Sequence, residues 1–201
     1  MAMKHDLRSQ RTWARIAGLT YWLVLVVDLG GMQLHSKTAS RSLLLTGSVL
    51  TIPLALGLYY ALRPVQSVLA LSALGFRLVE AALGILSTLA GFAAVQTALT
   101  PLSLGGNLLD LARWDDRTAF AAFVFTIGST FFFYLFVKSA YIPRILGWLG
   151  LFASVLALSA CLTHLLRPAF PAMTMYAWFP MLLAETSTGL WLVVNSVKAA
   201  N

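Results

Sequence analysis

The chain has 201 residues, of which 59% are hydrophobic and only 10% are charged, and its mean hydropathy is +0.82. Soluble domains are about 25% charged, and a chain of this length cannot enclose so much apolar surface in one aqueous core. The composition therefore excludes an ordinary soluble domain and indicates a protein embedded in lipid. The single cysteine, Cys161, also excludes an internal disulfide framework and a cysteine-based zinc site.

The net charge of +7 does not indicate a nucleic-acid partner. The basic residues are spread thinly at the ends of apolar runs, with no patch and no interleaved aromatic residues. Lysine and arginine in such places mark the cytoplasmic ends of membrane helices. The partner that the charge pattern predicts is the lipid bilayer.

Six segments are long and apolar enough to cross the hydrocarbon as helices, which takes about 20 residues each. In chain order they cover 14–33, 43–62, 67–95, 118–138, 143–166 and 172–197. Pro64 should push Arg63 out of helical geometry and end the second segment. Pro143 opens the fifth, where a missing N–H does no harm. The predicted fold class is all-α, a polytopic integral membrane protein with six transmembrane helices.

The distribution of lysine and arginine predicts that both termini are cytoplasmic. With the amino terminus inside, eight basic residues fall on the inner side and five on the outer side; the inner ones are Lys4, Arg8, Arg11, Arg15, Arg63, Lys138, Arg144 and Lys198, and the outer ones are Lys37, Arg41, Arg113, Arg117 and Arg167. We expect a cytoplasmic basic tail over 1–12, and a single transmembrane domain over 13–198 without internal repeats.

The longest connection, over 96–117, contains the leucine-rich stretch LLDLAR after a Gly105-Gly106 break. This pattern predicts a short amphipathic helix on the outer surface between the third and fourth spans. An ordinary ordered loop is the alternative.

Four ionisable residues lie within the predicted spans: Asp28, Arg77, Glu80 and Glu185. Each costs about 2.5–3.5 kcal/mol at a bilayer centre, so such residues usually face the bundle interior and pair with one another. Arg77 and Glu80, in the stretch FRLVE, are three apart and share one helical face.

The helical rise of about 1.5 Å per residue allows the depths of these residues to be compared. Asp28 and Glu80 come out about 20 Å from the inner edge, Glu185 about 18 Å and Arg77 about 15 Å. If the three helices adjoin, one arginine therefore faces three acids. Such a cluster is either a structural ion-pair network that fixes helix packing or a site that binds a ligand or handles protons.

Metal binding and catalysis find no support in the sequence. His164 near the outer end of the fifth span has no obvious second ligand, and interfacial hydrogen bonding explains it better. The motifs G-x-S-x-G, H-E-x-x-H and the P-loop are absent. We expect no cofactor and no metal, and an enzyme is the least favoured class.

Several short stretches in a fixed order resemble one family. They are RTWARIAGLTYWLVLV, LALGLYYALRPVQSVLALSALGFRLVEAALG, YIPRILGWLGLFASV and ETSTGLWLVVNSVK. Over roughly 12–197 the chain resembles domain-of-unknown-function family 4386, a group of bacterial membrane proteins. The resemblance matches the family's polar positions at Arg77, Glu80 and Glu185. The chain departs from the family near the fourth helix, where ARWDDR stands in place of a DLH-like motif.

The resemblance implies a six-helix protein of the bacterial cytoplasmic (inner) membrane, and it implies no reaction, substrate or cofactor. Three functional hypotheses therefore remain open. The cluster belongs to a carrier or binding protein for a small solute or protons, or the chain is an accessory or scaffolding subunit of a membrane complex, or it is a membrane enzyme. The chain is small for a stand-alone transporter, which makes a homodimer attractive under the first hypothesis.

Overall fold

The computed structural model describes residues 2–97, 114–166 and 171–197. Throughout these ranges the regular structure is helical. The helices are α1 (Ala2–Gln33), α2 (Lys37–Leu62), α3 (Ser67–Thr97), α5 (Trp114–Ser139), α6 (Arg144–Leu166) and α7 (Pro171–Val194). Each is long and apolar enough to cross a membrane. The predicted all-α fold with six such helices is therefore confirmed for the described part of the chain.

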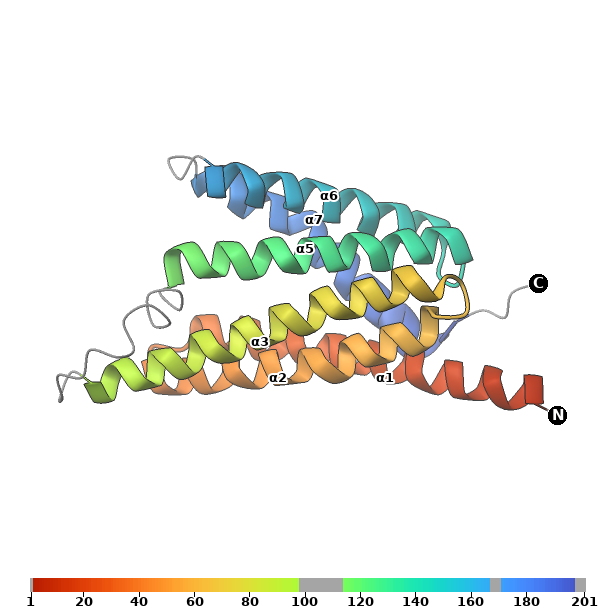
Figure 1. Ribbon diagram of the computed structural model, residues 1–201, viewed down its shortest axis with the longest axis horizontal. Helices are drawn as coiled ribbons and strands as arrows, with labels where there is room; N and C mark the ends of the chain where they lie inside the picture. Colours follow the sequence, from red (N-terminus) through yellow and green to blue (C-terminus); the bar gives the residue numbers. More distant parts are fainter. Residues whose placement is uncertain (1, 98–113, 167–170, 198–201) are drawn as a thin grey trace.

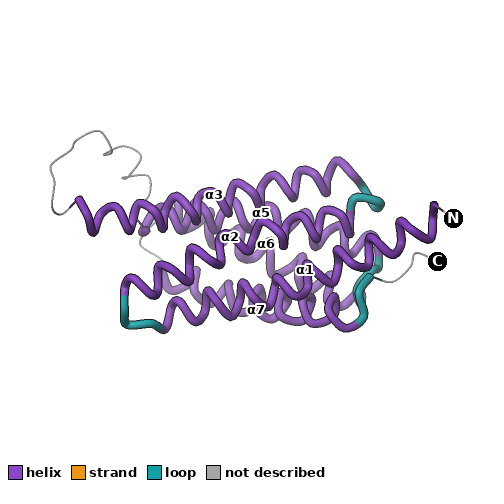
Figure 2. Tube along the Cα trace, turned by 90° about the horizontal axis from the view of Figure 1, so that it is seen from below, coloured by secondary structure: helices purple, strands orange, loops and turns teal. Residues whose placement is uncertain are grey.

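The helices form a closed ring, in which each packs against its neighbours in sequence and α7 returns to α1. In Figure 1, α1, α2 and α3 lie together in the lower part of the bundle, with α5 and α6 above them. Figure 2 shows the short loop at 34–36 that turns the chain from α1 into α2 at one end of the bundle. A closed ring gives α1, α3, α5 and α7 inward faces on which side chains from helices distant in sequence can meet.

Helix α7 closes the ring by crossing it obliquely, from beside α6 at one end to beside α1 at the other (Figure 1). In its first half, Met181 lies against α6, and the Ser154 hydroxyl is 3.8 Å from the methionine sulfur. In its second half, Gly189 lies against Gly18 of α1. Different parts of one helix thus hold the two sides of the bundle together.

Small residues set the closest approaches between helices, as is usual in membranes, where tight backbone packing drives association. A Cβ added at Gly18 would lie 2.7 Å from the Gly189 carbonyl oxygen and 2.8 Å from the Val193 backbone nitrogen. At Gly57 of α2 an added Cβ would lie 2.9 Å from the Ala17 Cβ atom. The facing atoms in these contacts are backbone atoms or Cβ atoms, so a larger residue at either glycine would push the two helices apart.

The structure corrects one detail at a helix end and agrees with another. Arg63, predicted to leave helical geometry before Pro64, keeps right-handed helical angles (φ −54°, ψ −32°), and its N–H still donates to the Tyr59 carbonyl oxygen at 2.7 Å. That prediction was wrong because the preference before proline is only statistical. Pro143 immediately precedes α6, and its carbonyl oxygen accepts the N–H groups of Leu146 and Gly147.

Helix α1 begins well before the predicted apolar segment at 14–33. The Gln10 side chain donates to the Ala61 carbonyl oxygen at 2.7 Å, and the Ser196 hydroxyl donates to the Arg11 carbonyl oxygen at 3.0 Å. These two bonds tie the start of α1 to the ends of α2 and α7. Of the connection predicted to hold an outer amphipathic helix, residues 98–113 lie outside the described part of the chain.

Candidate functional site

Arg77 and Glu80 form an ion pair inside the ring, with Nη1 of the arginine 2.9 Å from Oε2 of the glutamate. Their spacing of three residues on α3 places both on one helical face, as the sequence predicts. The arginine side chain is 3% exposed and the glutamate side chain 20%. Although these two atoms are close, their geometry is not that of a hydrogen bond. Both side chains can therefore still form hydrogen bonds with another group.

Helix α5 provides the surface against which Arg77 lies. The guanidinium carbon is 4.6 Å from the centre of the Phe125 ring, a distance at which a cation is attracted to an aromatic face. One turn further along α5, Gly128 leaves space for the stem of the arginine, since an added Cβ would lie 3.2 Å from the Arg77 Cγ atom. An aromatic face and a missing side chain on α5 together seat the charge inside the ring.

Glu185 reaches the same interior from α7 and is 8% exposed. Tyr21 of α1, which is also buried, donates a hydrogen bond to its carboxyl group. Arg77 interacts electrostatically with both of these residues as well as with Glu80. The structure thus brings Arg77, Glu80 and Glu185 together from two helices that are not neighbours around the ring.

Asp28 lies on α1 and is only half-buried. Its carboxyl group packs directly against the Cα of Gly47 on α2, where any larger residue would displace it. Arg77, Glu80 and Glu185 all interact with it electrostatically. Asp28 therefore belongs to the same charged cluster, at the edge nearest α2, and has no direct ion pair among the described residues.

Besides the two atoms of the ion pair, three buried polar atoms of the cluster have no hydrogen-bond partner among the described residues: Nε of Arg77, Oε1 of Glu185 and Oγ1 of Thr188. Thr188 is completely buried and sits three residues after Glu185, on the same face of α7. Most other described hydroxyl groups in the spans donate to the carbonyl oxygen one turn earlier, as Thr51 and Thr88 do. The Thr188 hydroxyl makes no such bond and stays available.

Sequence reasoning identified the four charged residues and missed Tyr21, Thr188 and Phe125. A signal existed for the first two, since Tyr21 precedes Asp28 by seven residues on α1 and Thr188 follows Glu185 by three on α7. Both spacings return a side chain to the same helical face. Phe125 gave no signal, because a phenylalanine in an apolar helix is ordinary.

The described residues contain no group of three or more His, Cys, Asp or Glu side chains that could hold a metal ion. His164 has a buried Nδ1 without a hydrogen-bond partner in the same part of the chain. The chemistry within reach of the charged cluster is therefore that of its own groups: a guanidinium, carboxyl groups, a phenol and a hydroxyl. Such a set can hold a polar molecule or exchange protons.

The family comparison agrees with the sequence motifs that follow α1, whereas the first motif, RTWARIAGLTYWLVLV, lies outside the matched residues. Neither the curated proteins nor the solved structures contain a match to this chain. A family described as a domain of unknown function, DUF4386, matches residues 35–195, which include Arg77, Glu80, Glu185 and Thr188. The match begins after α1, so Tyr21 and Asp28 lie outside it. Since the matched region covers most of the chain, the protein belongs to the DUF4386 family.

Proposed function

We propose that this protein binds, and moves within the membrane, a small polar solute or protons at the cluster of Asp28, Arg77, Glu80 and Glu185. The observation that carries the proposal is the set of buried polar atoms on Arg77, Glu185 and Thr188 that have no hydrogen-bond partner in the described part of the chain. A buried polar group left unbonded costs about 1–3 kcal/mol, and more when charged. A polar species bound between α3 and α7 would supply the partners that these atoms lack.

The balance of charge supports the same conclusion. One guanidinium faces three carboxyl groups, and only one of these, on Glu80, is in direct contact with it. Unpaired charge is strongly disfavoured inside a membrane. A bound cation, a proton or a solute that carries hydrogen-bond donors relieves the excess of carboxyl groups, so the cluster suits exchange of such a species better than permanent closure.

The proposed topology places this site in the bacterial cytoplasmic membrane, with both termini on the cytoplasmic side. The start of α1, the α2–α3 and α5–α6 turns and the end of α7 all lie at one end of the bundle (Figure 1). That end carries Arg8, Arg11, Arg63 and Arg144, which supports its assignment to the inner face. Within this proposal 13–198 form one transmembrane domain, preceded by the basic tail at 1–12.

The test is a flux measurement in sealed proteoliposomes with four probes: protons followed by a trapped pH dye, and labelled methylammonium, acetate and glycine. Flux of at least one probe above that of protein-free vesicles is expected from the wild type. Glu185→Gln keeps an acceptor for the Tyr21 hydroxyl and removes the charge, so it should fold and lower that flux by about tenfold or more. Ser72→Ala, near the start of α3 and away from the cluster, is the control and should match the wild type.

If no probe crosses faster than through empty vesicles, or if Glu185→Gln carries the probe as well as the wild type does, the proposal is wrong.

A scaffolding role within a larger membrane complex is then favoured by one observation. Arg77 connects α3 electrostatically to α1 and α7, which are not its neighbours around the ring. A charge network of that kind can serve only to fix helix packing.

A further inference from the structure

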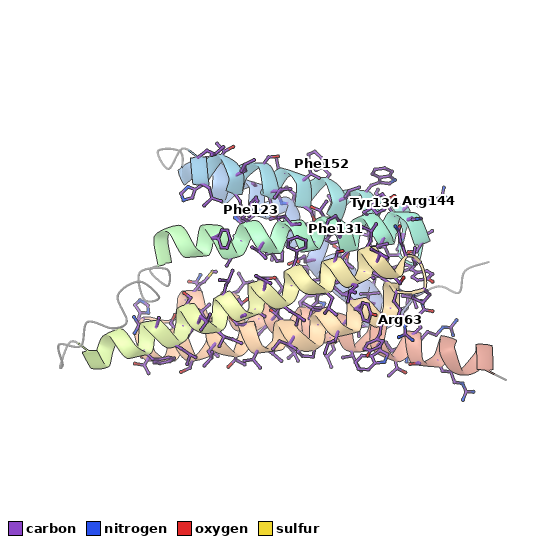
Figure 3. The ribbon with its side chains drawn as sticks, in the orientation of Figure 1. Arg63, Phe123, Phe131, Tyr134, Arg144 and Phe152 are labelled. Atoms are coloured by element: carbon purple, nitrogen blue, oxygen red, sulfur yellow. The ribbon has the colours of Figure 1, made fainter. Side chains whose placement is uncertain are left out.

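One end of the helical bundle is rich in basic side chains. The exposed basic side chains at this end are Arg8, Arg11, Arg15, Arg63, Lys138 and Arg144. Figure 3 shows Arg63 and Arg144 close to this end, on opposite sides of the bundle. Among the described residues the only ion pair is the interior one of Arg77 and Glu80, so none of these six side chains is paired with a described carboxyl group.

Arg63 is held against an aromatic ring. Its guanidinium carbon lies 5.2 Å from the centre of the Tyr60 ring, and that ring stacks on Trp13 of α1 with centroids 4.7 Å apart and planes 24° apart. The Arg63 backbone is fixed by its own hydrogen bond to Tyr59. The result is an exposed guanidinium held over a two-ring aromatic stack at the junction of α1 and α2.

The level of Arg63 along the bundle is that of lipid headgroups. The apolar span of α2 runs from Thr38 to Leu62, so Arg63 follows its last residue. In the same way Arg144 is the first residue of α6, the whole length of which is an apolar span. Arginine, tryptophan and tyrosine at this boundary are suited to the interfacial zone, where phosphate groups are found.

We propose that this basic end binds anionic phospholipids, and that Arg63 on the Tyr60–Trp13 stack holds a headgroup phosphate. A planar guanidinium presents paired N–H donors that match phosphate geometry. Stacking on the rings orients this donor in advance, so little side-chain freedom is lost when the lipid binds. A marker of membrane orientation needs only positive charge, whereas a headgroup site also needs the ordered guanidinium.

The experiment uses the full-length protein in detergent with an equal mixture of phosphatidylglycerol and phosphatidylcholine, and counts bound lipids by native mass spectrometry. The wild type should retain phosphatidylglycerol preferentially. Arg63→Gln should lower this preference by about fivefold, and Arg63→Lys, which keeps the charge without the planar donor, should recover only part of it. Arg41→Gln, at the other end of α2, is the matched control and should leave the preference unchanged.

Three outcomes would overturn the proposal. The first is equal retention of the two lipids by the wild type. The second is an equal effect of the Arg63 and Arg41 changes, which would mean that net charge alone attracts the lipid. The third is an Arg63→Lys protein that behaves as the wild type, which would remove the ordered guanidinium from the site. Because Arg63 is exposed, its variants are expected to fold, and their helicity and elution volume check this directly.

Discussion

Breaking the interior ion pair from either side should destabilise the protein strongly and unequally. Glu80→Gln leaves Arg77 charged, and Arg77→Ala leaves the carboxyl groups without their cation. Removal of one partner of a buried pair typically costs about 3–5 kcal/mol because the other charge is stranded. The structure indicates where in this range each variant should fall.

Glu80→Gln should fall near the lower limit, about 3 kcal/mol. The Glu80 side chain is 20% exposed, and Asp28 and Glu185 remain within electrostatic range of the arginine. Arg77→Ala should reach about 5 kcal/mol or more. It also removes the contact with the Phe125 ring at 4.6 Å, and such a contact is worth up to about 2 kcal/mol when desolvated.

The free energy of unfolding can be measured by titrating the purified protein from mild detergent into denaturing detergent and following helicity. Arg8→Ala is the control, since an exposed charge should change stability by no more than about 0.5 kcal/mol. The double variant Arg77→Met with Glu80→Leu should be less destabilised than Arg77→Ala, because it removes the Glu80 carboxyl group together with its cation and the apolar side chains fill the space. If both single variants unfold like the control, the ion pair of Arg77 and Glu80 does not lie in a low-dielectric interior.

Three further substitutions test the packing and the hydrogen bonding around the cluster. Gly18→Ala should destabilise the α1–α7 contact by about 1–3 kcal/mol because its new Cβ meets backbone atoms. Gly75→Ala, with nothing within 4 Å, should instead stabilise α3 by about 0.5–1 kcal/mol. The same unfolding titration measures both, and equal effects would contradict the close approach of α1 and α7. Tyr21→Phe should cost about 1.5–3 kcal/mol through loss of the hydrogen bond to Glu185, and the same change in a Glu185→Leu background should have little effect if that bond is its cause.

The helices were predictable because lipid simplifies the problem. Every backbone polar group must be satisfied within a span, so apolar segments of sufficient length have to be helical. The ends were less predictable. The segment at 14–33 omits the beginning of α1, because the bonds of Gln10 and Ser196 to distant carbonyl oxygens are tertiary contacts without a local signal.

The candidate site was only partly predictable for a related reason. Helical spacing alone places Arg77 beside Glu80, and hydropathy alone marks Asp28 and Glu185 as unusual. The order of helices around the ring is a property of packing between distant segments. For that reason the phenol of Tyr21, the ring of Phe125 and the gap at Gly128 could be assigned to the cluster only from the structure.

The closure of the ring by α7 has a consequence for biosynthesis. Helices leave the ribosome in order, so α1 enters the bilayer long before the helix that covers its Gly18 face and accepts the Tyr21 hydroxyl. Until α7 is inserted, the side of α1 that carries Tyr21 and Asp28 lacks the helix that covers it in the folded protein. A nascent chain stalled before α7 should therefore be a better substrate for membrane quality-control proteases than one released after it.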